Sequence, residues 1–189
     1  MEDDYIVPQA GDFEGTLLAE RQPKKYDVII GNPPYVRVPR NHPAALAMPS
    51  VVHGAPNLYF LFAAMSLFNL QEEGEMVYII PRSWTSGEYF RRFRTYLLNN
   101  GKIVQIHLFV SRDKVFKQEQ VLQETLIIKV QKTAKTPDTV KITSTESNSD
   151  LNRLPALPCL MVRSLRGTAV CLSSDIRRRC SCHSNNPSL

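Results

Sequence analysis

The sequence predicts an α/β domain whose sheet is mostly parallel, ends in an antiparallel hairpin and carries helices on both faces. Three observations predict this class. Val28, Ile29 and Ile30 form a short β-branched run, which is typical of a strand covered on both faces of a parallel sheet. Two segments with helical character follow, after Asn57 and after Thr85. Residues 102–109 and 121–130 then predict two strands of a hairpin.

The first predicted strand leads into a rigid polar turn, within the stretch Tyr-Asp-Val-Ile-Ile-Gly-Asn-Pro-Pro-Tyr at residues 26–35. Gly31 allows the backbone to turn or another group to approach closely. Pro33 and Pro34 fix two φ angles and have no N–H to donate. The Asn32 side chain and the Pro33 carbonyl are acceptors, and Tyr35 sets a flat ring beside them. Such a turn suits a planar group bearing an amine, for example the exocyclic amine of adenine.

A buried helix is predicted after this turn, because the segment from Asn57 is apolar nearly all round. Asn57 is its expected N-cap and Gly74 its expected stop. A strand at residues 76–80 follows and runs into Pro81-Arg82-Ser83-Trp84. Ligands collect at the carboxyl ends of strands in open α/β sheets. Trp84 therefore either lines a pocket or packs under a loop.

A second helix is predicted from a capping box, Thr85-x-x-Glu88, to Asn99, with Asn100-Gly101 as its stop. Apolar side chains recur at helical spacing and predict its core face: Tyr89, Phe93, Tyr96 and Leu97. Arginines point elsewhere: Arg91, Arg92 and Arg94. This basic face either meets phosphate or is simply solvated.

Residues 36–56 contain four prolines and show no apolar period, which predicts a long loop leaving the Asn32–Tyr35 turn. Loops of this length in compact domains are usually functional or disordered. Because the Asn32–Tyr35 turn suits a planar amine such as that of adenine, we hypothesise that the loop closes over the nucleotide held there or touches a nucleic-acid backbone. His42 and His53 are interpreted as solvated loop residues rather than ligands or bases.

Composition divides the chain in two. The 189 residues, 43% of them hydrophobic, are enough for one globular, soluble domain. The net charge of +5 belongs to the tail, since residues 151–189 hold six Arg and one Asp whereas residues 1–150 hold 17 basic and 17 acidic groups. All sixteen aromatic residues lie at or before Phe116, and all four cysteines lie after residue 150. We therefore expect a folded domain at residues 1–135, followed at 136–189 by a linker and a disordered or aberrant tail.

No metal site, membrane segment or secretory signal is expected. Cys180-Ser-Cys182-His183 lacks the Cys-x-x-Cys spacing and a second ligand pair. The acidic start lacks the basic flank and apolar core of a secretory signal, and the longest apolar run, residues 58–68, is too short to span a bilayer. These features predict a cytoplasmic protein.

Asn32-Pro33-Pro34-Tyr35 after a hydrophobic strand resembles the catalytic motif of S-adenosylmethionine-dependent DNA adenine methyltransferases of type II restriction-modification systems. The resemblance covers roughly residues 10–132. It implies that Asn32, Pro33, Pro34 and Tyr35 are catalytic, with S-adenosyl-L-methionine as co-substrate and double-stranded DNA with a flipped adenine as partner. The fold it implies is the second half of a Rossmann-like methyltransferase sheet.

Three further residues gain implied roles from the same resemblance. Asp12 and Phe13 would end the strand before the catalytic strand, where the family binds the adenine of the cofactor; the alternative is an acidic loop residue with a core Phe. Phe116, between the last two strands, would support the target base beside Tyr35, unless it is a plug that closes the hairpin. Trp84 would join them in binding substrate if it lines the pocket.

A methyltransferase of this class also needs a Gly-rich cofactor loop ahead of Asp12, and none of the eight glycines forms a Gly-x-Gly pair. Residues 1–135 therefore correspond to a partial catalytic domain, and the isolated chain is expected to be inactive. A missing N-terminal half or a recognition domain is an expected partner. Two alternatives stay open: a protein-glutamine methyltransferase, and a non-catalytic remnant or complementing fragment.

Overall fold

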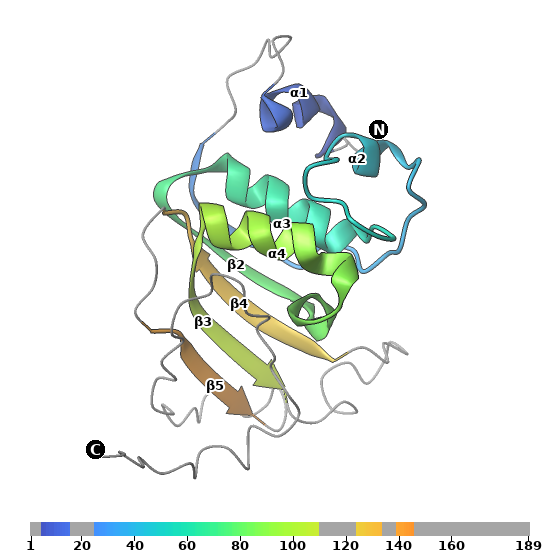
Figure 1. Cartoon of the computed structure of the whole chain (residues 1–189). Coiled ribbons are helices and arrows are strands. Elements are labelled where there is room, and N and C mark those ends of the chain that lie inside the picture. Colours follow the sequence, from blue (N-terminus) through green and yellow to red (C-terminus); the bar gives the residue numbers. More distant parts are fainter. Residues whose placement is uncertain (1–4, 16–24, 110–123, 134–138, 146–189) are drawn as a thin grey trace, which may run out of the picture.

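The structure, a computed structural model, describes residues 5–15, 25–109, 124–133 and 139–145. Its core is a five-stranded sheet in the order β1-β2-β4-β3-β5, with two helices, α3 and α4, lying side by side on one face (Figure 1). The strands are β1 Tyr26–Gly31, β2 Leu70–Pro81, β3 Lys102–Phe109, β4 Thr125–Gln131 and β5 Lys141–Thr145. The helices are α1 Ala10–Glu14, α2 Pro43–Leu46, α3 Leu58–Asn69 and α4 Arg91–Asn100. Three short 3₁₀ turns are η1 Val7–Gln9, η2 Arg82–Thr85 and η3 Glu88–Phe90.

The strand directions confirm the predicted α/β class with its antiparallel hairpin. β1 and β2 are parallel, β4 is antiparallel to both β2 and β3, and β5 is parallel to β3. Alternate residues of β2 and β4 are buried beneath the helices, among them Met76, Tyr78, Leu126 and Ile128. In the described part of the chain, both long helices cover this one face, whereas the sequence predicts helices on both faces.

β1 lies at the edge of the sheet, which contradicts the prediction of a strand covered on both faces. Val28 is 55% exposed and Ile30 is 77% exposed, whereas Ile29 between them is partly buried against the core. The β-branched run correctly predicts a strand with a parallel partner. Burial depends on a second neighbour, and no described strand pairs with the other edge of β1.

Helix α3 begins as predicted, since the Asn57 side chain accepts a hydrogen bond from the Tyr59 N–H at 3.3 Å. Its end differs, because Leu70 is already extended and starts β2, and Gly74 lies within that strand. Lysines satisfy the terminal carbonyls in place of a glycine cap. The Lys132 ammonium donates to the carbonyls of Phe68 and Leu70 at 2.7 and 2.8 Å.

The predicted capping box at Thr85-x-x-Glu88 is wrong. Ser86 is extended and Gly87 has a φ of 79°, so the backbone between Thr85 and Glu88 leaves the helical path. The Thr85 hydroxyl donates to the Arg82 carbonyl instead, at 2.9 Å. Helix α4 starts only at Arg91, and it ends before Gly101 as predicted. Phe93 and Leu97 form its buried face, while Tyr89 lies outside it and is 60% exposed.

Strand β5 extends the sheet beyond the boundary expected at residue 135. His107 on β3 is buried and its two ring nitrogens contact the hydroxyls of Thr143 and Thr145 at 2.8 and 3.1 Å. Burial lowers the pKa of His107, which favours the neutral ring. The predicted tail after residue 145 lies outside the described residues.

Among the described residues, no helix is long and apolar enough to cross a membrane. In that same part of the chain, no group of three or more His, Cys, Asp or Glu side chains could hold a metal ion.

Candidate functional site

Several segments meet at the edge of the sheet where β1, β2 and β3 have their carboxyl ends. The Asn32–Tyr35 turn follows β1, and η2 follows β2. Because β4 is antiparallel to β2 and β3, Thr125 at its start lies opposite Pro81, near the end of β3 at Phe109. The Arg82 N–H donates to the Glu124 carbonyl at 2.7 Å, and their side chains form an ion pair. This edge is the expected place for a ligand in an open α/β sheet.

Asn32 is exposed at this edge. Its side chain has no hydrogen-bond partner among the described residues, so both its carbonyl and its amide group are available. Pro33 is buried behind it and Pro34 is exposed. All described peptide bonds are trans, so the two prolines shape the turn through their fixed φ angles.

Tyr35 is held in place through its hydroxyl and its ring. The hydroxyl donates to the Ile79 carbonyl on β2 at 2.9 Å. The ring lies edge-to-face with Tyr59, with ring centroids 6.3 Å apart and planes at 86°. Burial raises the pKa of Tyr35 to about 12, so the hydroxyl stays protonated and the ring stays neutral.

Tyr59 and Ser83 are supporting residues that the sequence analysis did not single out. The Tyr59 and Ser83 hydroxyls are 3.1 Å apart, which connects the first turn of α3 to η2. Burial raises the pKa of Tyr59. The Asn57 cap places Tyr59 in the first turn of α3, where its ring contacts that of Tyr35. Its position two residues after the predicted N-cap was the sequence signal that could have identified it.

Gly31 has no side chain, and this allows the Tyr78 ring to lie close to its backbone. A Cβ at this position would lie 2.8 Å from Cε1 of the Tyr78 ring. Its φ is not in the left-handed region, so the glycine is required for space rather than for a turn. The end of β1 can therefore lie beside β2 with the Tyr78 ring close to its backbone.

The loop at residues 36–56 is closed at its base and partly built into the core. Arg37 and Asn57 form an isolated antiparallel bridge, and the Val38 N–H donates to the Pro56 carbonyl at 2.9 Å. Met48 and Val51 are fully buried. His42 caps α2 by accepting from the Ala44 N–H at 3.2 Å, and His53 lies 3.4 Å from the Glu88 carboxylate. The histidines thus have structural contacts rather than exposed, unengaged rings.

Two of the predicted arginines hold loops together. A single guanidinium nitrogen of Arg94 lies 2.8 to 3.2 Å from the carbonyls of Trp84, Ser86 and Gly87. Arg92 donates to the carbonyls of Pro49 and Val52. Arg91, in contrast, is exposed and pairs with Glu88 at 3.1 Å.

Trp84 is in the core, which corrects the view that it lines a pocket. Its side chain is 2% exposed, and its ring lies edge-to-face with Phe93 at 6.0 Å. Of its two predicted positions, lining a pocket is not observed, and the ring packs into the core against α4. Phe116 lies outside the described residues, so its predicted contact with the base stays a prediction.

Asp12 and Phe13 are on helix α1, not at the end of a strand, and the structure does not bring them to the turn. The Phe13 ring packs against Phe68 and Tyr96, with centroids 5.5 and 5.2 Å away. Phe68 is nine residues beyond Tyr59 on α3, which places Phe13 about 13 Å along that helix from the Tyr35 contact. Pro8 in η1 and the left-handed Gly15 favour a helical turn here rather than a strand.

Known proteins resemble this chain over most of its described length. The sequence model of a family described as Eco57I restriction-modification methylase matches residues 5–116. The chain is 40% identical over 132 residues to the type II methyltransferase M.BsuBI of Bacillus subtilis, covering 69% of this chain and 26% of that protein. It is 35% identical over 136 residues to M.PstI of Providencia stuartii, covering 72% and 27%. The chain thus spans about a quarter of the length of these relatives.

Solved structures support the fold. A Listeria monocytogenes protein described as a class I S-adenosylmethionine-dependent methyltransferase has a TM-score of 0.53 at 19% identity, over 69% of this chain and 40% of that chain. A protein from Vibrio vulnificus, described as a modification subunit of a type I restriction enzyme, has a TM-score of 0.56 at 16% identity, over 69% of this chain and 29% of that chain. The mixed sheet is thus a partial Rossmann-like methyltransferase fold.

The family match covers more than half of the chain and includes the Asn32–Tyr35 turn, β1, β2 and both long helices. The chain belongs to the Eco57I restriction-modification methylase family.

Proposed function

We propose that this chain supplies the target-base half of a DNA adenine methyltransferase. The observation that carries the proposal is the exposed Asn32 side chain, without a partner among the described residues, beside the anchored ring of Tyr35 at the carboxyl edge of the sheet. The names of the relatives, type II methyltransferases, support methyl transfer as the reaction.

In this proposal the turn holds the exocyclic amine of adenine through two neutral acceptors. The Asn32 side-chain oxygen and the Pro33 carbonyl accept the two N–H hydrogens. This grip favours a pyramidal nitrogen whose lone pair points outward, which makes the amine a better nucleophile. A base is not needed before the attack, and the proton leaves to solvent afterwards.

Tyr35 would stack on the flipped base. Rotating the base out of the duplex costs a few kcal/mol, and stacking on an aromatic ring returns about 1–3 kcal/mol. Because Ile79 and Tyr59 already fix the Tyr35 ring, little side-chain entropy remains to be lost on binding. Phe116 is proposed as the second aromatic contact to the base.

S-adenosyl-L-methionine is the proposed methyl donor, and the described residues do not fit a complete site for it. Phe13 packs against Phe68 of α3 and Tyr96 of α4, away from the Asn32–Tyr35 turn. We therefore propose that the donor is bound mainly by protein sequence that these 189 residues do not contain.

Substitution of Asn32 tests the proposed role. The matched stretch of this chain would replace its counterpart in M.BsuBI, and transfer of labelled methyl groups to DNA would be measured. Asn32→Ala should lower kcat by about 100-fold or more, by analogy with the removal of other single hydrogen-bonding groups from active sites. The dissociation constant for S-adenosylmethionine should stay the same.

Asn99→Ala is the matched control, because Asn99 is an exposed asparagine on α4. It should keep the parental rate. If Asn32→Ala retained the parental kcat, the turn would not hold the reacting amine and the proposal would fail.

A further inference from the structure

Pairing between β1 and β2 ends at Gly31, one residue before Asn32. Gly31 lies opposite Tyr78 in the parallel ladder, and the Asn32 side chain that follows is exposed. Pro33 then fixes the next φ angle, so the turn has little freedom of its own to correct its position. The position of the Gly31 backbone therefore determines where the Asn32 side chain projects.

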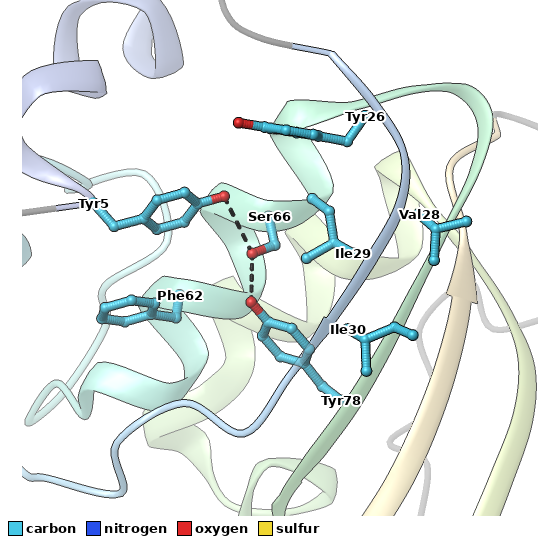
Figure 2. Close-up of a pocket in the computed structure, with 8 residues that line it drawn as sticks. All are labelled: Tyr5, Tyr26, Val28, Ile29, Ile30, Phe62, Ser66 and Tyr78. Carbon is cyan, nitrogen blue, oxygen red and sulfur yellow. Dashed lines mark hydrogen bonds between the residues drawn. The ribbon is translucent and has the colours of Figure 1, made fainter.

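The Tyr78 ring occupies the space that a side chain at position 31 would need. Figure 2 shows the Tyr78 side chain pointing from β2 toward Ser66 on α3. Cε1 and Cζ of the ring would lie 2.8 and 3.3 Å from a Cβ at Gly31. Tyr78 is 5% exposed, so the ring is enclosed by the core. The ring thus sets how closely the end of β1 approaches that core.

The ring is held at its far end by hydroxyl groups. The Ser66 hydroxyl lies 2.6 Å from the Tyr78 hydroxyl and 3.4 Å from that of Tyr5, as the dashed lines in Figure 2 mark. The Tyr5 hydroxyl also accepts from the Asn69 amide at 3.0 Å. Burial raises the pKa of Tyr78, so its hydroxyl stays protonated and the ring stays neutral. Tyr78 is therefore a fixed support that joins α3 to the end of β1.

Gly31 depends on this support more than another residue would. Glycine has no side chain to pack and has the largest conformational freedom of any residue. Loss of the Tyr78 ring would leave a cavity into which the Gly31 backbone could move. A displacement of about 1 Å can lower a reaction rate by about 100-fold, since the reacting atoms must be aligned. A shift of Gly31 should therefore be detectable in the rate of methyl transfer.

We propose that Tyr78 is a positioning residue for Asn32. Its ring holds the Gly31 backbone, and thereby sets where the Asn32 side chain meets the amine that it binds. The inference rests on the proposed function of the Asn32–Tyr35 turn and adds a part that lies outside that turn.

Gly31→Ala and Tyr78→Leu, alone and together, test the contact. The matched stretch of this chain again replaces its counterpart in M.BsuBI, and kcat and KM for DNA are measured. Each single substitution should lower kcat by about tenfold or more and leave KM within about threefold, because it displaces the reacting group and leaves the other DNA contacts in place.

The double variant gives the sharpest result. In Gly31→Ala the added methyl group needs the space that the ring occupies, and Tyr78→Leu provides that space. The double variant should therefore be at least about threefold faster than Gly31→Ala. The same substitution at position 78 slows the parent and accelerates Gly31→Ala, whereas two independent roles would make the two losses multiply.

Three further variants separate positioning from stability. Tyr78→Phe keeps the ring and should keep the parental kcat, although it loses the bond to Ser66 and should unfold at a lower urea concentration. Gly101→Ala is the control for crowding, because a Cβ there would lie 2.7 Å from Cγ1 of Val130, next to the start of β3 and away from the turn.

Phe93→Leu is the control for a lost ring, because Phe93 is 1% exposed and packs against Trp84 on the other side of α3 from Gly31's strand partner, within the contact between η2 and α4. Gly101→Ala and Phe93→Leu should both lower the urea midpoint and keep the parental kcat.

Urea denaturation of the 189-residue chain measures the contact without catalysis. Tyr78→Leu should lower the midpoint less in Gly31→Ala than in the parent. If the chimaera methylates an amine other than that of adenine, the proposed function fails, and the same set of variants with that amine still tests Tyr78. The inference is overturned if Tyr78→Leu keeps the parental kcat, if the two losses multiply, or if the two controls lose as much kcat as Tyr78→Leu.

Discussion

Tyr35 connects the candidate site to the sheet. Its hydroxyl bonds the Ile79 carbonyl, and its ring contacts Tyr59, which in turn contacts Ser83. Tyr35→Phe keeps the ring and removes one hydrogen bond, so we expect the free energy of unfolding at pH 8 to fall by about 1 kcal/mol. Urea denaturation would measure this loss, and an unchanged value would show that the bond does not stabilise the fold.

The same residue should affect stability in alkaline solution. Its pKa is about 12 in the folded protein and about 10 when unfolded, so the folded state keeps its proton longer. The unfolded state binds fewer protons between these values, and stability contributed by Tyr35 is present below pH 10 and lost as pH rises toward 12. The fall in unfolding free energy across this range should therefore be shallower in Tyr35→Phe than in the parent. Equal slopes would contradict the assigned shift.

Single residues differ in how far the sequence determines them. The close approach at Gly31 follows from a glycine next to a strand, and the contact with Tyr78 confirms it. The burial of Trp84 depends on Phe93, nine positions later on another element, and no local pattern contains that information. The prediction that Phe13 lies at the end of a strand was wrong for a related reason, since the Asp-Phe dipeptide does not specify whether it belongs to a strand or a helix.

One arginine, Arg94, holds the connection between β2 and α4 together. Arg94 contacts the carbonyls of Trp84, Ser86 and Gly87, in the segment where the chain passes from η2 to η3. Arg94→Ala should lower the free energy of unfolding by about 2 kcal/mol, because charged groups make the stronger hydrogen bonds. Urea denaturation is the measurement.

Arg91→Ala provides the comparison on the same helix. Its guanidinium is exposed and forms only a surface pair with Glu88, so the loss should be below about 0.5 kcal/mol. If the two variants were equally stable, Arg94 would not stabilise the segment at residues 84–87. Phosphate binding would then be the better explanation for this arginine.

Elements were predicted well where periodicity decides them and poorly where the backbone departs from it. The bounds of β3 and the start of α3 follow from alternation and from the Asn57 cap. The late start of α4 follows from Gly87, whose positive φ interrupts a pattern that otherwise favours a helix. The loop at residues 36–56 has no apolar period, yet Met48 and Val51 are buried, so deleting it would remove part of the core.

At the scale of the whole molecule, the order of elements was predictable and the surroundings of β1 were not. A β-branched run predicts a strand, but its exposure depends on neighbours in space. β5 was missed because Lys-Ile-Thr-Ser-Thr is short and polar, and its two buried threonines, Thr143 and Thr145, contact His107 on a strand distant in sequence.

The incomplete sheet leads to a prediction about the methyl donor. Titration of the 189-residue chain with S-adenosylmethionine should give no heat change that fits micromolar binding, because the described residues do not form a complete site. M.BsuBI would serve as the positive control. A micromolar Kd for the isolated chain would contradict this prediction.

The central claim is that the Asn32–Tyr35 turn holds an adenine amine. The most direct measurement is to incubate the chimaera of this chain and M.BsuBI with labelled S-adenosylmethionine, duplex DNA and a glutamine-bearing protein, and to identify the methylated product by mass spectrometry. The account predicts N6-methyladenine in the DNA, lost in Asn32→Ala and kept in Asn99→Ala. Methylated cytosine or methylated glutamine as the main product would contradict it.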